Sequence, residues 1–103
     1  MAEAELTTVA RPYARAAFSQ AIDEASGLQT WSRMLGMLSA TVQDPTVAAT
    51  LENPTLTRDQ EAAVLVELLG EELNDSGKNF ISILADYGRI GLIPRVAEMY
   101  ELL

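Results

Sequence analysis

The chain has 103 residues, of which 49% are hydrophobic and 21% charged, and 7 basic against 15 acidic side chains give a net charge of -8. This length allows a single domain with its own core, and the absence of Cys and His excludes Ser-His-Asp and Cys-His catalytic sites, Cys/His zinc sites and redox thiols. The acidic excess argues against binding to nucleic acids or to anionic membrane surfaces, since both attract basic proteins.

The first two predicted helices lie before residue 44. The Ala-rich segment 8–25 is expected to form the first, with Pro12 in its first turn or at a kink and Gly27 in a left-handed conformation after its end. The segment 28–43 is the clearest helix, because its apolar residues recur at i, i+3, i+4, i+7 and i+11, at Trp31, Met34, Leu35, Leu38 and Val42.

Local capping signals mark the next two helices. Asp44 followed by Pro45 is typical of a cap and a first helical residue, and it predicts a short helix that stops before Asn53-Pro54. Thr57 and Gln60 have the capping-box spacing, so a fourth helix is expected to run from there to about Gly70.

Two further helices follow a polar turn at residues 74–77. The fifth is expected over residues 79–87 with Gly88 as its stop, and the sixth from about Pro94, where apolar residues again recur with helical spacing. No strand pattern competes with these assignments. The sequence therefore predicts an all-α fold, a compact bundle of about six helices in one domain.

The sequence contains no signal for export or for direct insertion into a membrane. Residues 1–8 carry acidic side chains where a signal peptide has basic ones, and the apolar stretches are far shorter than the roughly 20 residues that span a bilayer. We therefore expect a soluble chain.

No catalytic, nucleotide-binding or metal-binding motif is complete. Gly77-Lys78 is similar to the end of a phosphate-binding loop, but Glu72 and Asn79 stand where that motif requires Gly and Ser or Thr. The same turn lacks the last ligand of a calcium loop, because Ile83 occupies the position of the bidentate Glu. We therefore expect no catalytic residue, no metal site and no cofactor.

Asp75-Ser76 at the start of a helix leaves one modification open. In carrier proteins, a serine in this setting receives a phosphopantetheine arm, although those proteins favour a large apolar residue where this chain has Gly77. The simpler interpretation is a turn that caps the following helix.

The first predicted helix carries more apolar surface than one core contact requires. Its apolar residues cover an arc of roughly 220°, about twice what one contact needs. Phe18 and Ile22 suit the core at one end of the arc, whereas Val9, Tyr13 and small alanines occupy the other and would let another helix approach closely.

The fifth predicted helix also has a surplus apolar position. Phe80, Ile81 and Leu84 suit the core, while Ile83 lies on the flank without an internal role. Either the two surplus faces bind an amphipathic partner helix, or both helices are central in the bundle and buried all round. The acidic surface favours a partner with basic residues on its exposed flank.

Two stretches resemble a known family. They are Thr7-Thr-Val-Ala-Arg-Pro-Tyr-Ala-Arg-Ala-Ala-Phe18 and Asn79-Phe-Ile-Ser-Ile-Leu-Ala-Asp-Tyr-Gly-Arg-Ile90. Both are similar to the best-marked stretches of the delta subunit of F-type ATP synthase, whose mitochondrial counterpart is the oligomycin-sensitivity-conferring protein. The resemblance extends in register across nearly the whole chain, including Trp31 and Asn53-Pro54.

The resemblance implies an amino-terminal domain that sits on the catalytic head and binds the amino-terminal helix of an alpha subunit between its first and fifth helices. By position, it places eight residues in that groove: Ala10, Tyr13, Ala14, Ala17, Asn79, Ser82, Ile83 and Asp86. Arg89 also matches a common family position, but its simpler interpretation is a cation near a helix carboxyl end.

Family members continue into a second domain that joins the b subunits of the peripheral stalk. The resemblance therefore implies that residues 1–103 are one helical domain of a longer two-domain subunit, a non-catalytic part of the stator at the cytoplasmic face of the bacterial inner membrane. Two alternatives remain, an unrelated helical adaptor that binds an amphipathic peptide and a carrier protein modified on Ser76.

Overall fold

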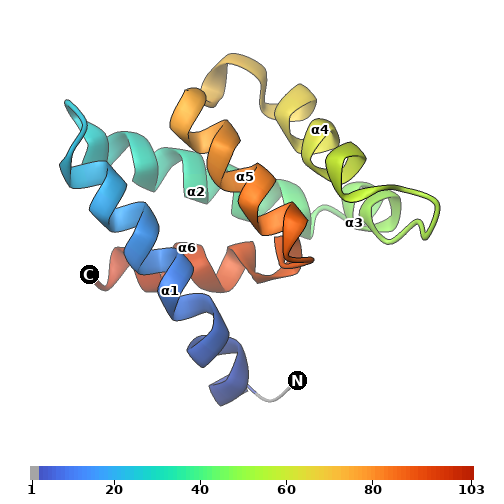
Figure 1. Ribbon diagram of the computed structural model, residues 1–103, viewed down its shortest axis with the longest axis horizontal. Helices are drawn as coiled ribbons and strands as arrows, with labels where there is room; N and C mark the ends of the chain where they lie inside the picture. Colours follow the sequence, from blue (N-terminus) through green and yellow to red (C-terminus); the bar gives the residue numbers. More distant parts are fainter. Residues whose placement is uncertain (1–2) are drawn as a thin grey trace.

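The computed structural model describes the backbone of residues 3–103 and the side chains of residues 4–103. Within these residues six α-helices and two 3-10 turns follow one another without a strand, which confirms the predicted all-α bundle (Figure 1). The elements are α1 (Glu3–Ile22), α2 (Gly27–Gln43), α3 (Pro45–Leu51), α4 (Arg58–Leu69), η1 (Gly70–Glu72), α5 (Asp75–Asp86), η2 (Ile90–Leu92) and α6 (Ile93–Glu101). None of the described helices is long and apolar enough to cross a bilayer.

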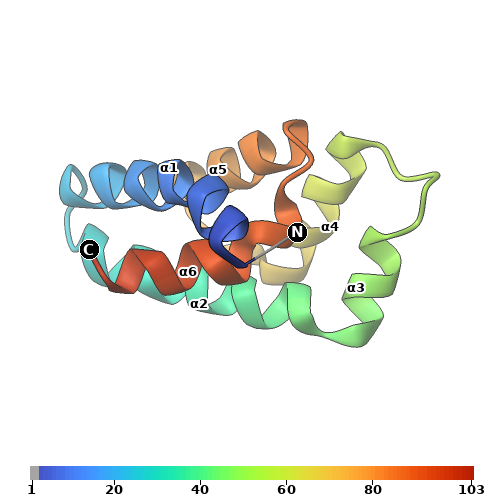
Figure 2. The ribbon, with the colours of Figure 1, turned by 90° about the horizontal axis from the view of Figure 1, so that it is seen from below.

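The helices form two layers, with α1 and α5 side by side over α2 and α6 (Figures 1 and 2). α6 packs against both α1 and α2, and α4 packs against α5. The core between the layers is apolar, and Trp31 meets Phe80 edge to face with ring centroids 5.3 Å apart. Its largest fully buried side chains are Trp31, Met34, Leu35, Leu38, Leu65, Ile81, Leu84, Ile93 and Val96.

Side chains cap α3 and α4 as their sequences predict. The Asp44 carboxylate accepts hydrogen bonds from the backbone N–H groups of Thr46 and Val47. Thr57 and Gln60 form a complete capping box, with the Thr57 hydroxyl accepting from the Gln60 N–H and the Gln60 side chain accepting from the Thr57 N–H. These caps satisfy backbone donors that have no partner within the helix.

Asn74 and two glycines fix the bounds of α4 and α5. The Asn74 side chain accepts from the Gly77 N–H and caps α5, which begins at Asp75, earlier than the predicted residue 79. Gly70 ends α4 with a φ of 56°, and Gly88 follows α5 with a φ of 68°. Both values lie in the region that glycine adopts without strain, so the predicted stops at Gly70 and Gly88 are confirmed.

The end of the first helix differs from the prediction. α1 ends at Ile22, and the left-handed residue is Ser26, with a φ of 53°, whereas Gly27 begins α2. A Cβ on Gly27 would lie 1.9 Å from the Ala21 carbonyl oxygen, so this glycine is required by the close approach of two backbones. Pro12 lies in the interior of α1, because this helix already begins at Glu3.

The predicted core residues of the first helix are only partly confirmed. Phe18 is half-buried and meets Tyr100 of α6 edge to face, with ring centroids 5.9 Å apart. Ile22 is 60% exposed at the last position of α1, so its assignment to the core is wrong. It lies directly before the turn at residues 23–26 that connects α1 to α2.

Candidate functional site

One flank of α5 exposes large apolar side chains toward α1. Ser76, Ile83 and Tyr87 are spaced at i, i+7 and i+11 and therefore share one side of this helix. The Ser76 hydroxyl donates to the Glu24 carboxylate at 2.8 Å, just beyond the end of α1, so this side faces α1. On it Ile83 is 40% exposed and Tyr87 67% exposed.

The facing flank of α1 carries Val9 and Tyr13, which are four residues apart and both half-buried. Arg89, which follows α5, stacks its guanidinium over the Tyr13 ring at 5.8 Å from the centroid and donates to the Tyr13 hydroxyl at 3.3 Å. A cation over an aromatic face is attracted by the ring quadrupole. We call the surface formed by Val9, Tyr13, Ile83 and Tyr87 the α1–α5 face.

Polar contacts join α1 to α5 at both ends of this face. At one end, Glu24 accepts hydrogen bonds from Gln20, Ser76 and the Trp31 indole. The bonds from Gln20 and Ser76 lower the pKa of Glu24 below its ordinary value of 4.5, while partial burial opposes them. At the other end, the contact is the one between Tyr13 and Arg89.

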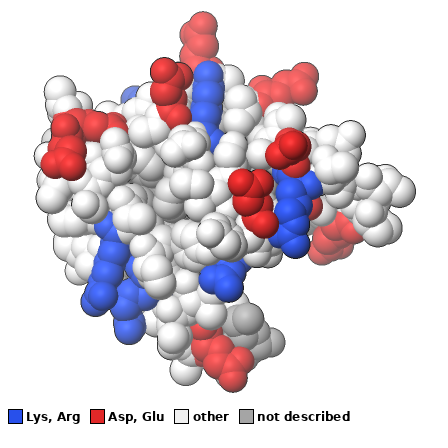
Figure 3. Space-filling model, viewed as in Figure 1, with Lys and Arg blue, Asp and Glu red and all other residues white. Residues whose placement is uncertain are grey.

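The strip between α1 and α5 is mostly uncharged, and charged side chains of both helices stand around it (Figure 3). Arg58 of α4 closes the carboxyl end of α5, where its Nη1 donates to the carbonyl oxygens of Ala85 and Asp86 at 3.0 and 2.9 Å. Arg58 is therefore the cation at this helix end, in the place that the simpler interpretation gave to Arg89. The arrangement presents an apolar strip between two tethered helices, a surface of the kind that binds the apolar side of a partner helix.

Comparison with known proteins assigns the family. A family model described as ATP synthase delta (OSCP) subunit matches residues 9–103. The chain belongs to this family. Among its curated relatives, each named ATP synthase subunit delta, the protein of Teredinibacter turnerae is 48% identical over 99 residues and that of Thioalkalivibrio sulfidiphilus is 44% identical over 99 residues. Each match covers 96% of this chain and 55% of the relative, so the chain spans about half the length of the delta subunits it matches.

Three of the predicted groove residues are not accessible in this delta-family fold. Ala10, Ala14 and Ala17 are at most 1% exposed, so they present almost no surface to a partner helix on the α1–α5 face. With Ala21 they form the buried stripe of α1, which packs on α6 and α2. The small side chains do allow a helix to approach closely, as predicted, but the neighbour is internal.

The remaining predicted residues lie on or beside the α1–α5 face. Tyr13 and Ile83 form part of it, whereas Asn79 and Asp86 are exposed on the side of α5 opposite the core. Ser82 is also exposed, on the side farther from α1. These three can contact only a partner that extends over the outer edge of α5.

The sequence reasoning missed Tyr87 as a member of this surface. Its position four residues after Ile83 was a usable signal, since residues at i and i+4 are neighbours on a helix. The contact of Arg89 with Tyr13 had no such signal, because 76 positions separate the two residues.

Ser76 has a structural role in this delta-family domain. Its half-buried hydroxyl donates to Glu24 and lies 2.9 Å from the Asn74 side-chain oxygen, so it forms part of the turn that caps α5. Family membership also excludes the alternative of a helical adaptor unrelated to ATP synthase. In the described residues, no three carboxylates gather as a metal site would require.

Proposed function

We propose that this domain is part of a non-catalytic stator subunit of F-type ATP synthase and binds the amino-terminal helix of an alpha subunit on the α1–α5 face. The observation that carries the proposal is the pair of exposed apolar side chains, Ile83 and Tyr87, turned toward α1. A monomeric domain gains nothing from leaving this strip in water, and a partner helix with apolar anchors at i, i+3, i+4 and i+7 would cover it.

Affinity in this proposal comes mainly from apolar burial. Each Å² of apolar surface removed from water contributes roughly 25 cal/mol, less the cost of ordering the partner segment. Tyr13 adds a rigid aromatic wall, because Arg89 holds its ring from one side. The net charge of -8 favours a segment with basic residues on the flank that stays exposed.

The mechanism in this proposal is mechanical. The head must be kept from rotating with the central shaft, so the contact has to transmit torque without yielding. The Glu24 hydrogen bonds and the Tyr13–Arg89 contact serve this role, because they fix the spacing of α1 and α5 at both ends of the face. The remaining half of the longer subunit would join the b subunits, and the whole would be peripheral at the cytoplasmic face of the bacterial inner membrane.

The test is reconstitution with the catalytic head. ATP synthase heads from the source organism, stripped of their delta subunit, are mixed with the 103-residue chain and separated by size-exclusion chromatography. We expect the chain to elute with the intact head and to elute alone when the alpha subunits lack their amino-terminal segments. Equal co-elution with both heads would show that the alpha segment is not the partner.

A further inference from the structure

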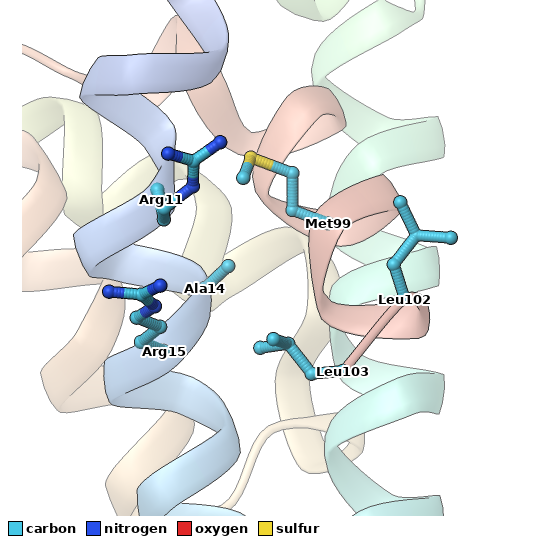
Figure 4. Close-up of a pocket in the computed structure, with 6 residues that line it drawn as sticks. All are labelled: Arg11, Ala14, Arg15, Met99, Leu102 and Leu103. Atoms are coloured by element: carbon cyan, nitrogen blue, oxygen red, sulfur yellow. The ribbon is translucent and has the colours of Figure 1, made fainter.

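The flank of α1 that faces away from the α1–α5 face carries two arginines one turn apart. Arg11 and Arg15 are exposed and lie at i and i+4, while Tyr13 between them points about 200° away. Figure 4 shows both arginines on α1 across from Met99, Leu102 and Leu103 at the end of α6. The two flanks of α1 therefore differ, one uncharged and one basic.

These two arginines differ from the other four of the chain, each of which has a partner among the described residues. Arg33 lies 3.9 Å from Glu72, Arg95 lies 3.5 Å from Glu98, and Arg58 binds the carbonyls at the end of α5. Within residues 4–103, no ion pair or hydrogen bond joins the side chain of Arg11 or Arg15 to any other group. The chain has 15 acidic side chains, yet none of those within residues 4–103 pairs with Arg11 or Arg15.

Apolar surface adjoins the two guanidinium groups. A surface pocket of about 100 Å³ opens between α1 and α6, lined by Arg11, Ala14, Arg15, Met99, Leu102 and Leu103. Leu102 is 86% exposed at its rim. The pocket therefore combines two positively charged side chains with room for one aliphatic side chain.

We propose that this α1–α6 face is a second docking surface and that it binds an acidic helical segment of a partner protein. Two carboxylates one turn apart on that segment pair with Arg11 and Arg15, and an aliphatic side chain on the same side enters the pocket. Arginine suits this task, because its planar guanidinium pairs with a carboxylate through two parallel hydrogen bonds. The surface is separate from the α1–α5 face, so both segments can be bound at once, and the inference does not depend on the proposed function.

An acidic peptide fits this surface better than an extended polyanion. A nucleic acid or an anionic bilayer brings many negative charges close to the whole protein, whose net charge of -8 repels them. A short segment meets only the local charge of the two arginines. The apolar pocket also has no counterpart in a phosphate backbone, whereas a Leu or Ile side chain fills it.

The test uses a designed peptide as the probe. A fluorescein-labelled helical peptide of roughly 18 residues carries Glu at positions i and i+4 and Leu at i+3 and i+7, and a second peptide has Gln in place of both Glu. Fluorescence anisotropy measures binding to the 103-residue chain. We expect the acidic peptide to bind at least about tenfold more tightly than the Gln peptide, and this difference to shrink as salt is raised.

Three variants locate the binding surface. The double variant Arg11→Gln/Arg15→Gln should abolish the preference for the acidic peptide, whereas Arg33→Gln, which removes an exposed arginine of α2, should retain it. Ile83→Asp on the α1–α5 face should also retain it. Thermal melting shows that each variant is folded, and the exposed positions of the arginines make this the expected result.

Other outcomes would overturn the proposal. Equal binding of the two peptides, or full binding by the double variant, would show that Arg11 and Arg15 recognise no carboxylates. Loss of binding on Ile83→Asp would place the peptide on the α1–α5 face instead. Binding to vesicles with anionic lipids that depends on both arginines, together with no preference for the acidic peptide, would assign the surface to a membrane.

Discussion

Glu24 connects three helices through one carboxylate. It lies after α1 and accepts hydrogen bonds from Gln20 of α1, Trp31 of α2 and Ser76 of α5. α1 and α2 meet at this turn, whereas α5 is distant in sequence and is held to them by such hydrogen bonds and by core packing. The Glu24 carboxylate therefore helps to fix the distance between α1 and α5.

Replacing Glu24 should change how stability depends on pH. The pKa of Glu24 is lowered in the folded state, chiefly by the bonds from Gln20 and Ser76, so its charge stabilises the fold above the unfolded-state pKa. This contribution is lost as pH falls through the lowered folded-state value. Glu24→Gln should therefore lower the urea midpoint at pH 7 and leave a smaller difference from the parent at pH 3.

The control for this prediction is Asp23→Asn, which removes the charge of an exposed neighbour. The prediction concerns the difference between variants, because other carboxylates also titrate over this range. If Glu24→Gln lowered the urea midpoint equally at pH 7 and pH 3, the effect would come from shape and not from charge.

At the scale of single elements, the starts of α3 and α4 could be predicted, whereas those of α1 and α5 and the burial of α1 could not. The caps of α3 and α4 depend on residues within three positions of one another, so the local sequence specifies Asp44 and the pair Thr57 and Gln60. The apolar arc of α1 shows only that several neighbours are possible. Which neighbour covers Ala10 and Ala14 depends on where α6 returns, more than 70 positions later.

The capping box gives a testable effect at this scale. Thr57→Ala removes the acceptor for the Gln60 N–H and should destabilise the domain by about 1 kcal/mol. The measurement is the free energy of unfolding from urea titration. Thr57→Ser, which keeps the hydroxyl, should lie close to the parent, and an equal loss in both variants would contradict the role of the cap.

At the scale of the whole molecule, the number of helices and the all-α class could be predicted from the spacing of apolar residues and from the capping and turn residues between helices. The two-layer arrangement did not, since it depends on contacts such as Arg89 on Tyr13 that link distant positions. Ile83 was nevertheless placed on the flank of α5, because its neighbours Phe80, Ile81 and Leu84 already account for the buried side of that helix. The sequence thus placed Ile83 correctly on an exposed flank of α5. It assigned Ala10, Ala14 and Ala17 of α1 to an open groove, although these side chains are buried.

Trp31 reports on the core as a whole. It is 1% exposed and packs against Phe80, so its fluorescence should be that of a buried indole and should shift to longer wavelength when the domain unfolds in urea. The shift should coincide with the loss of helical circular dichroism, because one core joins the two layers. Native emission like that of free indole in water would contradict the packing of α2 against α5.

The measurement that tests the central claim most directly is calorimetric titration of the parent, Ile83→Asp and Leu68→Asp with a peptide copying the alpha subunit's amino-terminal segment. Leu68 is also exposed but lies on α4, away from the α1–α5 face. An unpaired carboxylate in an apolar contact costs several kcal/mol, so Ile83→Asp should melt near the parent and bind at least about a hundredfold more weakly. Leu68→Asp should bind like the parent, whereas undiminished binding by folded Ile83→Asp would contradict the claim that this face is the site.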